Sequence, residues 1–408
     1  MKSACADTLP PAVIVAGSDW WGGTLGTIRS LGRRGVPVHV VSGEKERAVY
    51  AASRFVREMI PLGTGGPREK VLDGLLTWAA KQKAASRPFL VPHSDWDCVD
   101  IVRHRARVEE HFCLAMPSAE LVMGLQDKAR ACALAESHGL DVPPYASVAS
   151  PLELRTALER IGCPAVMKPL QWSDAGDLPF KVVKIDTATD FLEKGAELLR
   201  SGATLIVQQY VPGEDEAIEV CMFYRSLDGR ETRMCTGFKK RQFPPGQGVM
   251  AYGEARDLPE LAGKSRRFVE DIDYRGFGGI EFKRYKGREY FIEMSTRPEA
   301  FHALAVRAGV DLPWYAYSDV VLDRPEGGAD EQCPAGYVDE AALLGLLRHH
   351  RREVALFREI RPYLFRRNTV FALWDIEDLL PWVFFLAKRV TRFLARSLRA
   401  PAGRHRGS

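Results

Sequence analysis

Short apolar runs alternate with amphipathic stretches over the first hundred residues. The runs PAVIVAG (residues 11–17) and VPVHVVS (residues 36–42) flank WWGGTLGTIRSLGRRG, which predicts a glycine turn leading into a helix. A later run, PFLVPHSDWD (residues 88–97), predicts another strand with Asp95 just past its end. This order predicts a parallel α/β domain, whose ligands would bind at the carboxyl edge of the sheet. A helix N-cap is an equally open role for Ser94 or Asp95.

The pattern changes from about residue 125 onward. Residues 125–145 and 150–162 predict capped helices, and CPAVMKPL (residues 163–170) predicts a strand that ends at Lys168. A helix at 187–200 leads to two strands around a Pro-Gly turn (residues 204–224). Alternating strands, a helix at 259–272 and a hairpin at 276–297 follow. We therefore expect two α+β lobes after the parallel domain.

The last hairpin predicts two glutamates that face each other. If its loop is residues 286–288, Tyr285 pairs with Glu289, and Glu281 then lies opposite Glu293. Facing carboxylates repel unless one is protonated or a cation lies between them, and Mg²⁺ is such a cation. The alternative, two solvated glutamates on an exposed face, stays open. The other face of the hairpin predicts a core stripe of Ile280, Phe282, Tyr290 and Ile292.

Lysines at element boundaries and one strand end suggest what surrounds these glutamates. Lys128, Lys168 and Lys181 each lie where an ammonium group could reach a common cleft and bind phosphate. The strand VQQYVPG (residues 207–213) runs into a turn that could offer backbone amides to an adenine, and three acids (residues 214–216) follow within reach of a ribose. Each of these features alone is more often structural, and it is their shared order along the chain that indicates a nucleotide site.

Five motifs in this order resemble an ATP-grasp domain. They are LQDK, AVMKP, VQQYVPGED, GIEFKRY and FIEMSTR…AGVDLP. The resemblance is nearest to the carboxylate–amine ligase branch that includes D-aspartate ligase-like proteins. It implies an α/β pre-ATP-grasp domain (residues 1–118), a two-lobed α+β ATP-grasp domain (residues 119–322) and a basic, mostly helical C-terminal region (residues 323–408).

The resemblance also implies roles for individual residues. Lys128 and Lys168 would bind the ATP phosphates, and Lys181 would belong to the loop that covers them. Arg241 is a candidate anchor for a substrate carboxylate, against the alternative of a solvated loop charge. Arg297 would stabilise the transferring phosphoryl group. The adenine hinge would be Gln209, Tyr210 and Val211. Asp215 would contact the ribose, and Glu281 and Glu293 would bind Mg²⁺.

One position departs from the family pattern E-x-N-x-R. Ser295 replaces the asparagine that serves as a further metal ligand, and a hydroxyl is a poorer ligand than an amide oxygen. The resemblance implies an ATP- and Mg²⁺-dependent ligase that joins a small carboxylate, such as an amino acid, to an amine through an acyl phosphate. The alternatives are a nucleotide-binding protein without turnover and a dinucleotide-dependent oxidoreductase that uses the N-terminal glycines.

Composition and charge narrow the setting. The eight cysteines are scattered without ligand spacing, which favours a reducing cytoplasm over a zinc site. Residues 345–408 hold 14 Lys/Arg and 5 Asp/Glu, whereas the preceding residues hold 43 and 48, so the positive charge is confined to the C-terminal region. A nucleic-acid-binding protein more often spreads basic residues along a groove, and we therefore expect no nucleic-acid partner.

The C-terminal region predicts an amphipathic helix over residues 378–399. Its apolar stretch, residues 379–387, is far shorter than the roughly 20 residues that span a bilayer. One face of the predicted helix carries the basic residues Lys388, Arg392, Arg396 and Arg399. Such a helix could lie on the anionic inner surface of the membrane, and the equally open alternative is docking onto the body of the protein or onto a second subunit in a homodimer.

Overall fold

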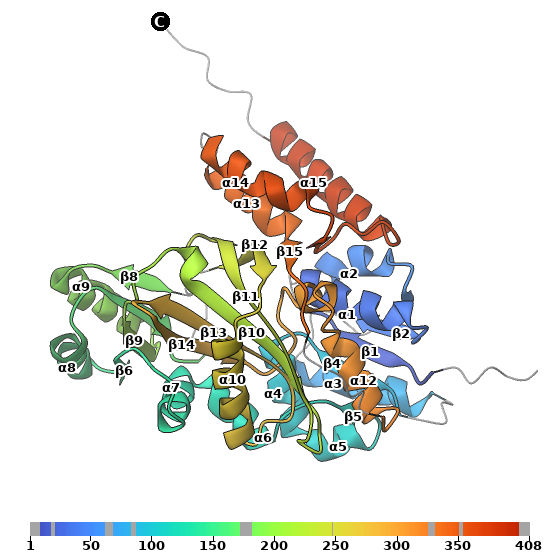
Figure 1. Ribbon diagram of the computed structural model, residues 1–408, viewed down its shortest axis with the longest axis horizontal. Coiled ribbons are helices and arrows are strands. Elements are labelled where there is room, and N and C mark those ends of the chain that lie inside the picture. Colours follow the sequence, from blue (N-terminus) through green and yellow to red (C-terminus); the bar gives the residue numbers. More distant parts are fainter. Residues whose placement is uncertain are drawn as a thin grey trace, which may run out of the picture.

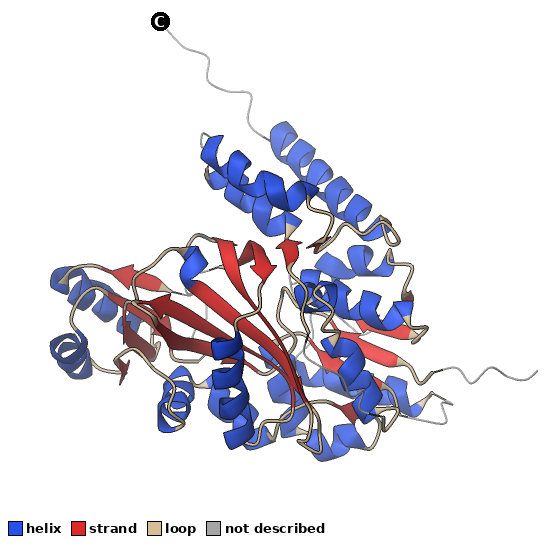
Figure 2. Ribbon diagram, viewed as in Figure 1, coloured by secondary structure: helices blue, strands red, loops and turns tan. Residues whose placement is uncertain are grey.

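Three β-sheets carry the architecture, with helices on their faces and at their ends (Figures 1 and 2). The computed structural model describes residues 9–17, 21–61, 68–82, 87–171, 182–246, 248–324, 331–350 and 354–399. The sheets have five, four and seven strands in chain order. The N-terminal one is parallel, and the other two are built mainly from antiparallel pairs. The predicted α/β plus α+β fold is confirmed.

The N-terminal sheet has the strand order β3-β2-β1-β4-β5. Its order reverses between β1 and β4, so a crevice at the carboxyl ends of these two strands is the expected ligand position. The strands are β1 (Ala12–Val15), β2 (Val38–Val41), β3 (Val56–Met59), β4 (Phe89–Pro92) and β5 (Cys113–Leu114). The helices are α1 (Trp21–Arg33), α2 (Glu44–Ala51), α3 (Arg68–Ala80), α4 (Asp95–Arg103) and α5 (Arg105–Glu109).

The glycines near the N-terminus form a helix face and not the turn predicted from the sequence. Gly22, Gly23 and Gly26 all lie inside α1. A Cβ atom on Gly23 would come within 2.5 Å of the Glu299 carbonyl oxygen, and one on Gly26 within 2.9 Å of the Ala303 Cβ. The glycines therefore let α1 approach the segment that follows the last hairpin. The turn on which the oxidoreductase alternative depended is not present at these glycines.

The four-stranded sheet, in the order β6-β9-β7-β8, forms a separate lobe (Figure 1). Two helices, α8 and α9, pack against each other beside it. The chain enters this lobe through α6 (Ala119–Gln126) and α7 (Lys128–Ser137). Asp127 caps α7 by accepting hydrogen bonds from the Ala129 and Arg130 amides. The elements of the lobe are β6 (Tyr145–Val148), α8 (Pro151–Ile161), β7 (Ala165–Pro169), β8 (Val183–Ile185), α9 (Ala188–Arg200) and β9 (Leu205–Gln209).

The seven-stranded sheet has the order β14-β13-β10-β11-β12-β15-β16. A short 3₁₀ helix, η2 (Asp215–Ala217), leads into it from β9. Its central elements are β10 (Ile218–Arg225), β11 (Thr232–Phe243), β12 (Val249–Ala255), α10 (Pro259–Asp271), β13 (Gly276–Tyr285) and β14 (Arg288–Ser295), followed by α11 (Ala303–Arg307) and α12 (Leu312–Val320).

The hairpin β13–β14 pairs Glu281 with Glu293, as predicted, but by another route. The turn has two residues, Lys286 and Gly287, both with positive φ, so Tyr285 pairs with Arg288 and not with Glu289. A register shift between Glu281 and Phe282 inserts one extra residue into β14, and this restores the pairing of Glu281 with Glu293. The shift also changes the core stripe on β14, where Phe291 and Met294 are buried and the predicted Tyr290 and Ile292 are only half-buried.

The C-terminal region contributes two strands as well as helices. Strand β15 (Ala335–Val338) pairs antiparallel with β12, and β16 (Thr369–Phe371) pairs parallel with β15. The sequence did not predict either strand. The helices are α13 (Glu340–His349), α14 (Val354–Phe365) and α15 (Leu380–Arg399), the last of which begins two residues after the predicted helix start. No described helix is both long enough and apolar enough to cross a bilayer.

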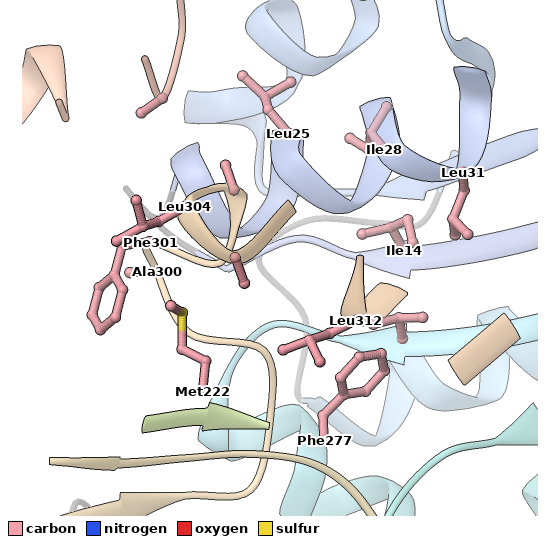
Figure 3. Packing of buried hydrophobic residues seen from close by; sticks show 14 of the residues in the cluster. Ile14, Leu25, Ile28, Leu31, Met222, Phe277, Ala300, Phe301, Leu304 and Leu312 are labelled. Atoms are coloured by element: carbon pink, nitrogen blue, oxygen red, sulfur yellow. The ribbon is translucent and has the colours of Figure 1, made fainter. Parts of the chain in front are cut away.

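The largest core cluster joins the N-terminal sheet to the seven-stranded sheet. Figure 3 shows α1 and β1 packed, through a loop and two helices, toward the strands β10 and β13. The labelled side chains are Ile14, Leu25, Ile28, Leu31, Met222, Phe277, Ala300, Phe301, Leu304 and Leu312. Because this cluster contains the segment after β14, the residues beyond Ser295 are fixed against the N-terminal domain.

Candidate active site

Glu281 and Glu293 share one face of the hairpin and lie opposite each other. The cation that neutralises Glu281 is Lys239 of β11, a residue that the sequence analysis did not identify. Its Nζ lies 2.7 Å from Glu281 Oε1 and 2.8 Å from Oε2, and the side chains are 5% and 11% exposed. Burial raises the pKa of Glu281 to about 7 even though Lys239 acts to lower it. Burial alone would lower the pKa of Lys239, but the surrounding carboxylates raise it.

Several predicted cations converge on Glu293. Burial acts to raise the pKa of this carboxyl group, but the charges of Lys168, Lys239, Lys128 and Arg297 together lower it below its usual range. A recess between the hairpin and α7 contains Lys128, Glu293, Ser295 and Arg297 among its lining residues. The structure therefore brings together five of the predicted residues, Lys128, Lys168, Glu281, Glu293 and Arg297, while their roles stay predictions.

The two lysines are held by neutral oxygen atoms. Lys128 is the first residue of α7, and its Nζ donates to the backbone carbonyls of Pro169 (2.9 Å) and Leu170 (3.4 Å). Lys168 is on β7 and is buried, and its Nζ donates to Gln208 Oε1 at 3.3 Å. The acceptors in these hydrogen bonds are uncharged, and the charges of both ammonium groups act on Glu293.

Arg297 is oriented by carboxylates on two sides. Its Nε lies 2.9 Å from Asp95 Oδ1 and its Nη1 lies 3.7 Å from Glu299 Oε2. Asp95 opens α4 at the carboxyl edge of the N-terminal sheet, and Ser94 is the N-cap of that helix. Charge from Asp95 and Glu299 outweighs burial and raises the pKa of Arg297. The guanidinium group is therefore fixed between the two domains.

Ser295, which occupies the asparagine position of the family pattern, lies next to a carboxylate. Its hydroxyl donates a hydrogen bond to Glu299 Oε1. Gly279, which pairs with Ser295, leaves the space for that carboxylate, because a Cβ at Gly279 would lie 2.4 Å from Glu299 Oε1. Burial raises the pKa of Glu299, although Arg297 acts to lower it. Glu299 follows the strand in a segment without periodicity, so no sequence signal pointed to it.

The predicted adenine hinge joins the two lobes. Gln209 ends β9 in the four-stranded sheet, and Tyr210 and Val211 follow on the way to β10 in the seven-stranded sheet. The Tyr210 ring lies between two ammonium groups, with Lys184 Nζ 4.7 Å and Lys283 Nζ 4.8 Å from its centroid. Lys184 lies on β8 of the four-stranded sheet, and Lys283 lies on β13 of the seven-stranded sheet.

Two further predictions can be placed and one cannot. Both oxygens of Asp215 accept hydrogen bonds from Gln242, at 3.0 Å from the backbone amide and 2.8 Å from Nε2. Arg241 is bound by Glu359 of α14, with Nη2 2.8 Å from Oε2, and no described hydrogen bond or ion pair links it to Glu281, Glu293 or Arg297. Lys181 lies outside the described residues.

The donor set fits a magnesium nucleotide better than a self-contained metal centre. Among the residues that the structure describes, no three His, Cys, Asp or Glu side chains converge to hold a metal ion. A pair of facing carboxylates suits Mg²⁺, because this ion commonly completes its shell with phosphate oxygens and water. The surrounding lysines and arginine supply the charge that polyphosphate needs.

Comparison with known proteins agrees with this architecture. A biotin carboxylase domain dimer of the Hydrogenobacter thermophilus 2-oxoglutarate carboxylase, solved with MgADP and bicarbonate, superposes with a TM-score of 0.64 at 17% identity over 80% of this chain and 74% of that one. An N5-carboxyaminoimidazole ribonucleotide synthetase in complex with ADP gives 0.61 at 18% identity over 84% and 86%. The D-aspartate ligase of Enterococcus faecium is 23% identical over 287 residues, 66% of this chain and 67% of the ligase.

The fold is that of the ATP-grasp superfamily. The formate-dependent phosphoribosylglycinamide formyltransferase of Wolinella succinogenes, another relative, is 26% identical over 195 residues. That match covers 47% of this chain and 49% of the formyltransferase, so the chain spans about half the length of such curated relatives. No protein-family model matches the chain. At these identities the comparisons leave the substrates of this ATP-grasp-like chain undetermined.

Proposed function

We propose that this ATP-grasp-like protein is an ATP- and Mg²⁺-dependent ligase that joins a small carboxylate to an amine. The observation that carries the proposal is the facing pair Glu281 and Glu293, with Lys128, Lys168 and Arg297 gathered around Glu293. Three members of this cluster, Lys168, Glu281 and Arg297, are buried. Buried charged groups are costly to a fold, so such a cluster is typical of a site that binds a charged ligand.

The reaction would need little covalent work from the protein. A carboxylate oxygen of the substrate attacks the γ-phosphorus of ATP and ADP leaves, which gives an acyl phosphate. The amine nitrogen then attacks the acyl carbon, phosphate leaves, and the nitrogen loses a proton to form the amide. Positioning and charge neutralisation supply the rate acceleration in such a transfer.

The residues divide this work by their positions. Lys128 and Lys168 would bind the phosphates at the lobe boundary, and Arg297, held by Asp95 and Glu299, would stabilise the charge that develops on the transferred phosphoryl group. Mg²⁺, when bound at Glu281 and Glu293, would neutralise phosphate charge. Arg241 remains the candidate anchor for the carboxylate substrate, and it would have to exchange its contact with Glu359 for one with the substrate.

The adenosine would bind between the sheets, against the backbone that follows Gln209. Asp215 is held by Gln242, whereas its neighbour Glu214 is exposed, and the charges of both acids act on Lys283. Either acid can reach the ribose hydroxyls only if it lies on the nucleotide side of the hinge. Alanine substitution of each acid, with calorimetry of ADP binding, would identify which one does.

The proposal is tested by a phosphate-release screen of carboxylic acids against amines, with Mg²⁺ and ATP. Glu293→Gln should lower the rate of the active pair at least ~100-fold, as expected when an interaction specific to the transition state is lost. Glu289→Gln is the matched control, because Glu289 lies on the same strand but pairs with Lys264 and should leave the rate unchanged. Nucleotide binding without turnover for any pair would favour the non-catalytic alternative, and no Mg²⁺-dependent nucleotide binding would overturn the proposal.

A further inference from the structure

Exposed apolar side chains gather in the C-terminal region. Of the large hydrophobic residues that are exposed in the described part of the chain, ten lie between residues 357 and 390 and four lie elsewhere. Scattered single residues of this kind are ordinary on a soluble surface, but a concentrated group marks an interaction site. The ten are Phe357, Leu364, Phe365, Trp374, Ile376, Leu379, Leu380, Val383, Phe384 and Val390.

Helix α15 is held on the body by only one of its faces. Phe385 is buried against Trp21 of α1, with ring centroids 5.8 Å apart, and the Lys388 ammonium donates to the Lys45 carbonyl of α2. Trp382 and Leu386 complete this docked face. In Figure 1, α15 lies along the edge of the molecule beside α2, which it contacts. The opposite face of α15 therefore points away from the protein.

That outer face of α15 is apolar. It consists of Leu380, Val383, Phe384 and Val390, which are 53%, 46%, 47% and 56% exposed. Their spacing places them in one sector of a helix. Ile376 and Leu379, 76% and 43% exposed, extend the same apolar surface into the loop before the helix.

The C-terminal region as a whole is positively charged, since residues 345–408 hold 14 Lys/Arg and 5 Asp/Glu. Asp375 and Glu377 both bind Arg33, at 2.6 and 2.7 Å, and Asp378 binds Arg29 at 3.0 Å. Glu359 binds Arg241. Several arginines on and after α14 are exposed, namely Arg358, Arg361 and Arg367. An apolar surface on a region of net positive charge complements an anionic lipid surface.

We propose that the outer face of α15 inserts into the headgroup region of an anionic membrane. The apolar side chains would lie at the boundary of the acyl chains, while the arginines of the C-terminal region meet the lipid headgroups. The helix is too short in apolar residues to span, so the association is peripheral. A second copy of the chain is a poorer occupant, because a two-fold contact pairs a patch with itself and would bring these basic groups together.

The test uses the full chain and vesicles of two compositions, pure phosphatidylcholine and phosphatidylcholine with phosphatidylglycerol. We expect co-sedimentation with the anionic vesicles only, weakened by 0.5 M salt because the attraction is screened. Val383→Asp/Phe384→Asp should reduce the bound fraction about tenfold. Leu152→Asp is the matched control, since Leu152 is 75% exposed on α8, far from α15 in Figure 1. It should bind as the parent chain does.

Each other outcome overturns the proposal. Absence of binding, equal binding to neutral vesicles, or an equal loss in the Leu152 variant would each contradict a specific anionic lipid surface. If sedimentation equilibrium instead shows a dimer that the Val383/Phe384 variant dissociates, and vesicles bind neither form, the outer face covers a second subunit. Circular dichroism and nucleotide binding of the variants confirm that they are folded.

Discussion

Lys239 is the residue whose replacement should reveal most about the acidic pair. In Lys239→Met the side chain keeps its length but loses the ammonium group that lies 2.7 and 2.8 Å from the two oxygens of Glu281. Both side chains are nearly inaccessible, at 5% and 11% exposed, so Glu281 would be left buried without a counter-charge. Removing one partner of a buried pair costs about 3–5 kcal/mol.

The cost should depend on pH in a defined direction. The pKa of Glu281 is raised from its usual 4.5 to about 7 in the folded protein, so its ionisation destabilises the fold as the pH rises through this interval. Lys239 acts to lower that pKa, and without it the pKa rises further. The variant should therefore continue to lose stability above pH 7, and its difference from the parent chain should be smallest near pH 5, where Glu281 is protonated.

Urea denaturation at pH 5 and pH 8.5 measures both quantities. Lys240→Met is the control, because Lys240 pairs with Glu216 at the surface, where such pairs contribute about 1 kcal/mol or less. Lys239→Met/Glu281→Gln should recover most of the lost stability, since the uncompensated charge is gone. An equal loss at both pH values, or no recovery in the double variant, would refute the view that the Lys239 charge neutralises Glu281.

Three further substitutions test other parts of the structure. Ser295→Asn should weaken Mg²⁺-nucleotide binding at least ~10-fold in calorimetry, because it removes the hydroxyl hydrogen bond to the Glu299 carboxylate and crowds that side chain. Ser295→Asn/Glu299→Ala should recover binding, and tighter binding by the single variant would contradict this reasoning. Glu340→Gln should reduce the loss of stability between pH 5 and 8, since burial raises the pKa of Glu340 to about 7 and its ionisation in the folded protein costs on the order of 3 kcal/mol. If the free energy of unfolding in urea depends on pH as in the parent chain, Glu340 does not titrate in this range. Gly124→Ala should stabilise α6 by about 1 kcal/mol, read as a higher Tm, because nothing lies within 4 Å of the added Cβ; a lower Tm would reveal a contact in solution.

The acidic pair shows how far sequence reasoning reached. Alternation along two strands was enough to place Glu281 opposite Glu293, because side chains on paired strands share faces. The predicted loop was one residue too long, and the extra residue in β14 compensated for that error. A bulge leaves no fixed mark in a sequence, so the core stripe on β14 could not be placed correctly.

The residues that were missed come from other elements of the fold. Lys239 lies in a continuously buried stretch of β11, where a lysine needs a partner, and asking what neutralises two facing glutamates would have pointed to it. Asp95 was recognised at the edge of the N-terminal sheet, but its contact with Arg297 joins residues 202 positions apart in sequence. Contacts of this kind depend on how domains pack, which local patterns do not contain.

The ion pair between Arg29 and Asp378 has a consequence for how this protein can be dissected. Arg29 of α1 also donates to the carbonyls of Ala372 and Leu373, while β15 and β16 belong to the seven-stranded sheet. The C-terminal region thus connects the N-terminal domain to the sheet that carries the acidic pair. Cutting the chain after Asp323 would leave the buried Arg29 guanidinium without its carboxylate and would remove two strands of the seven-stranded sheet. Truncation would therefore damage the N-terminal domain and this sheet together, and only point substitutions can separate membrane attachment from chemistry.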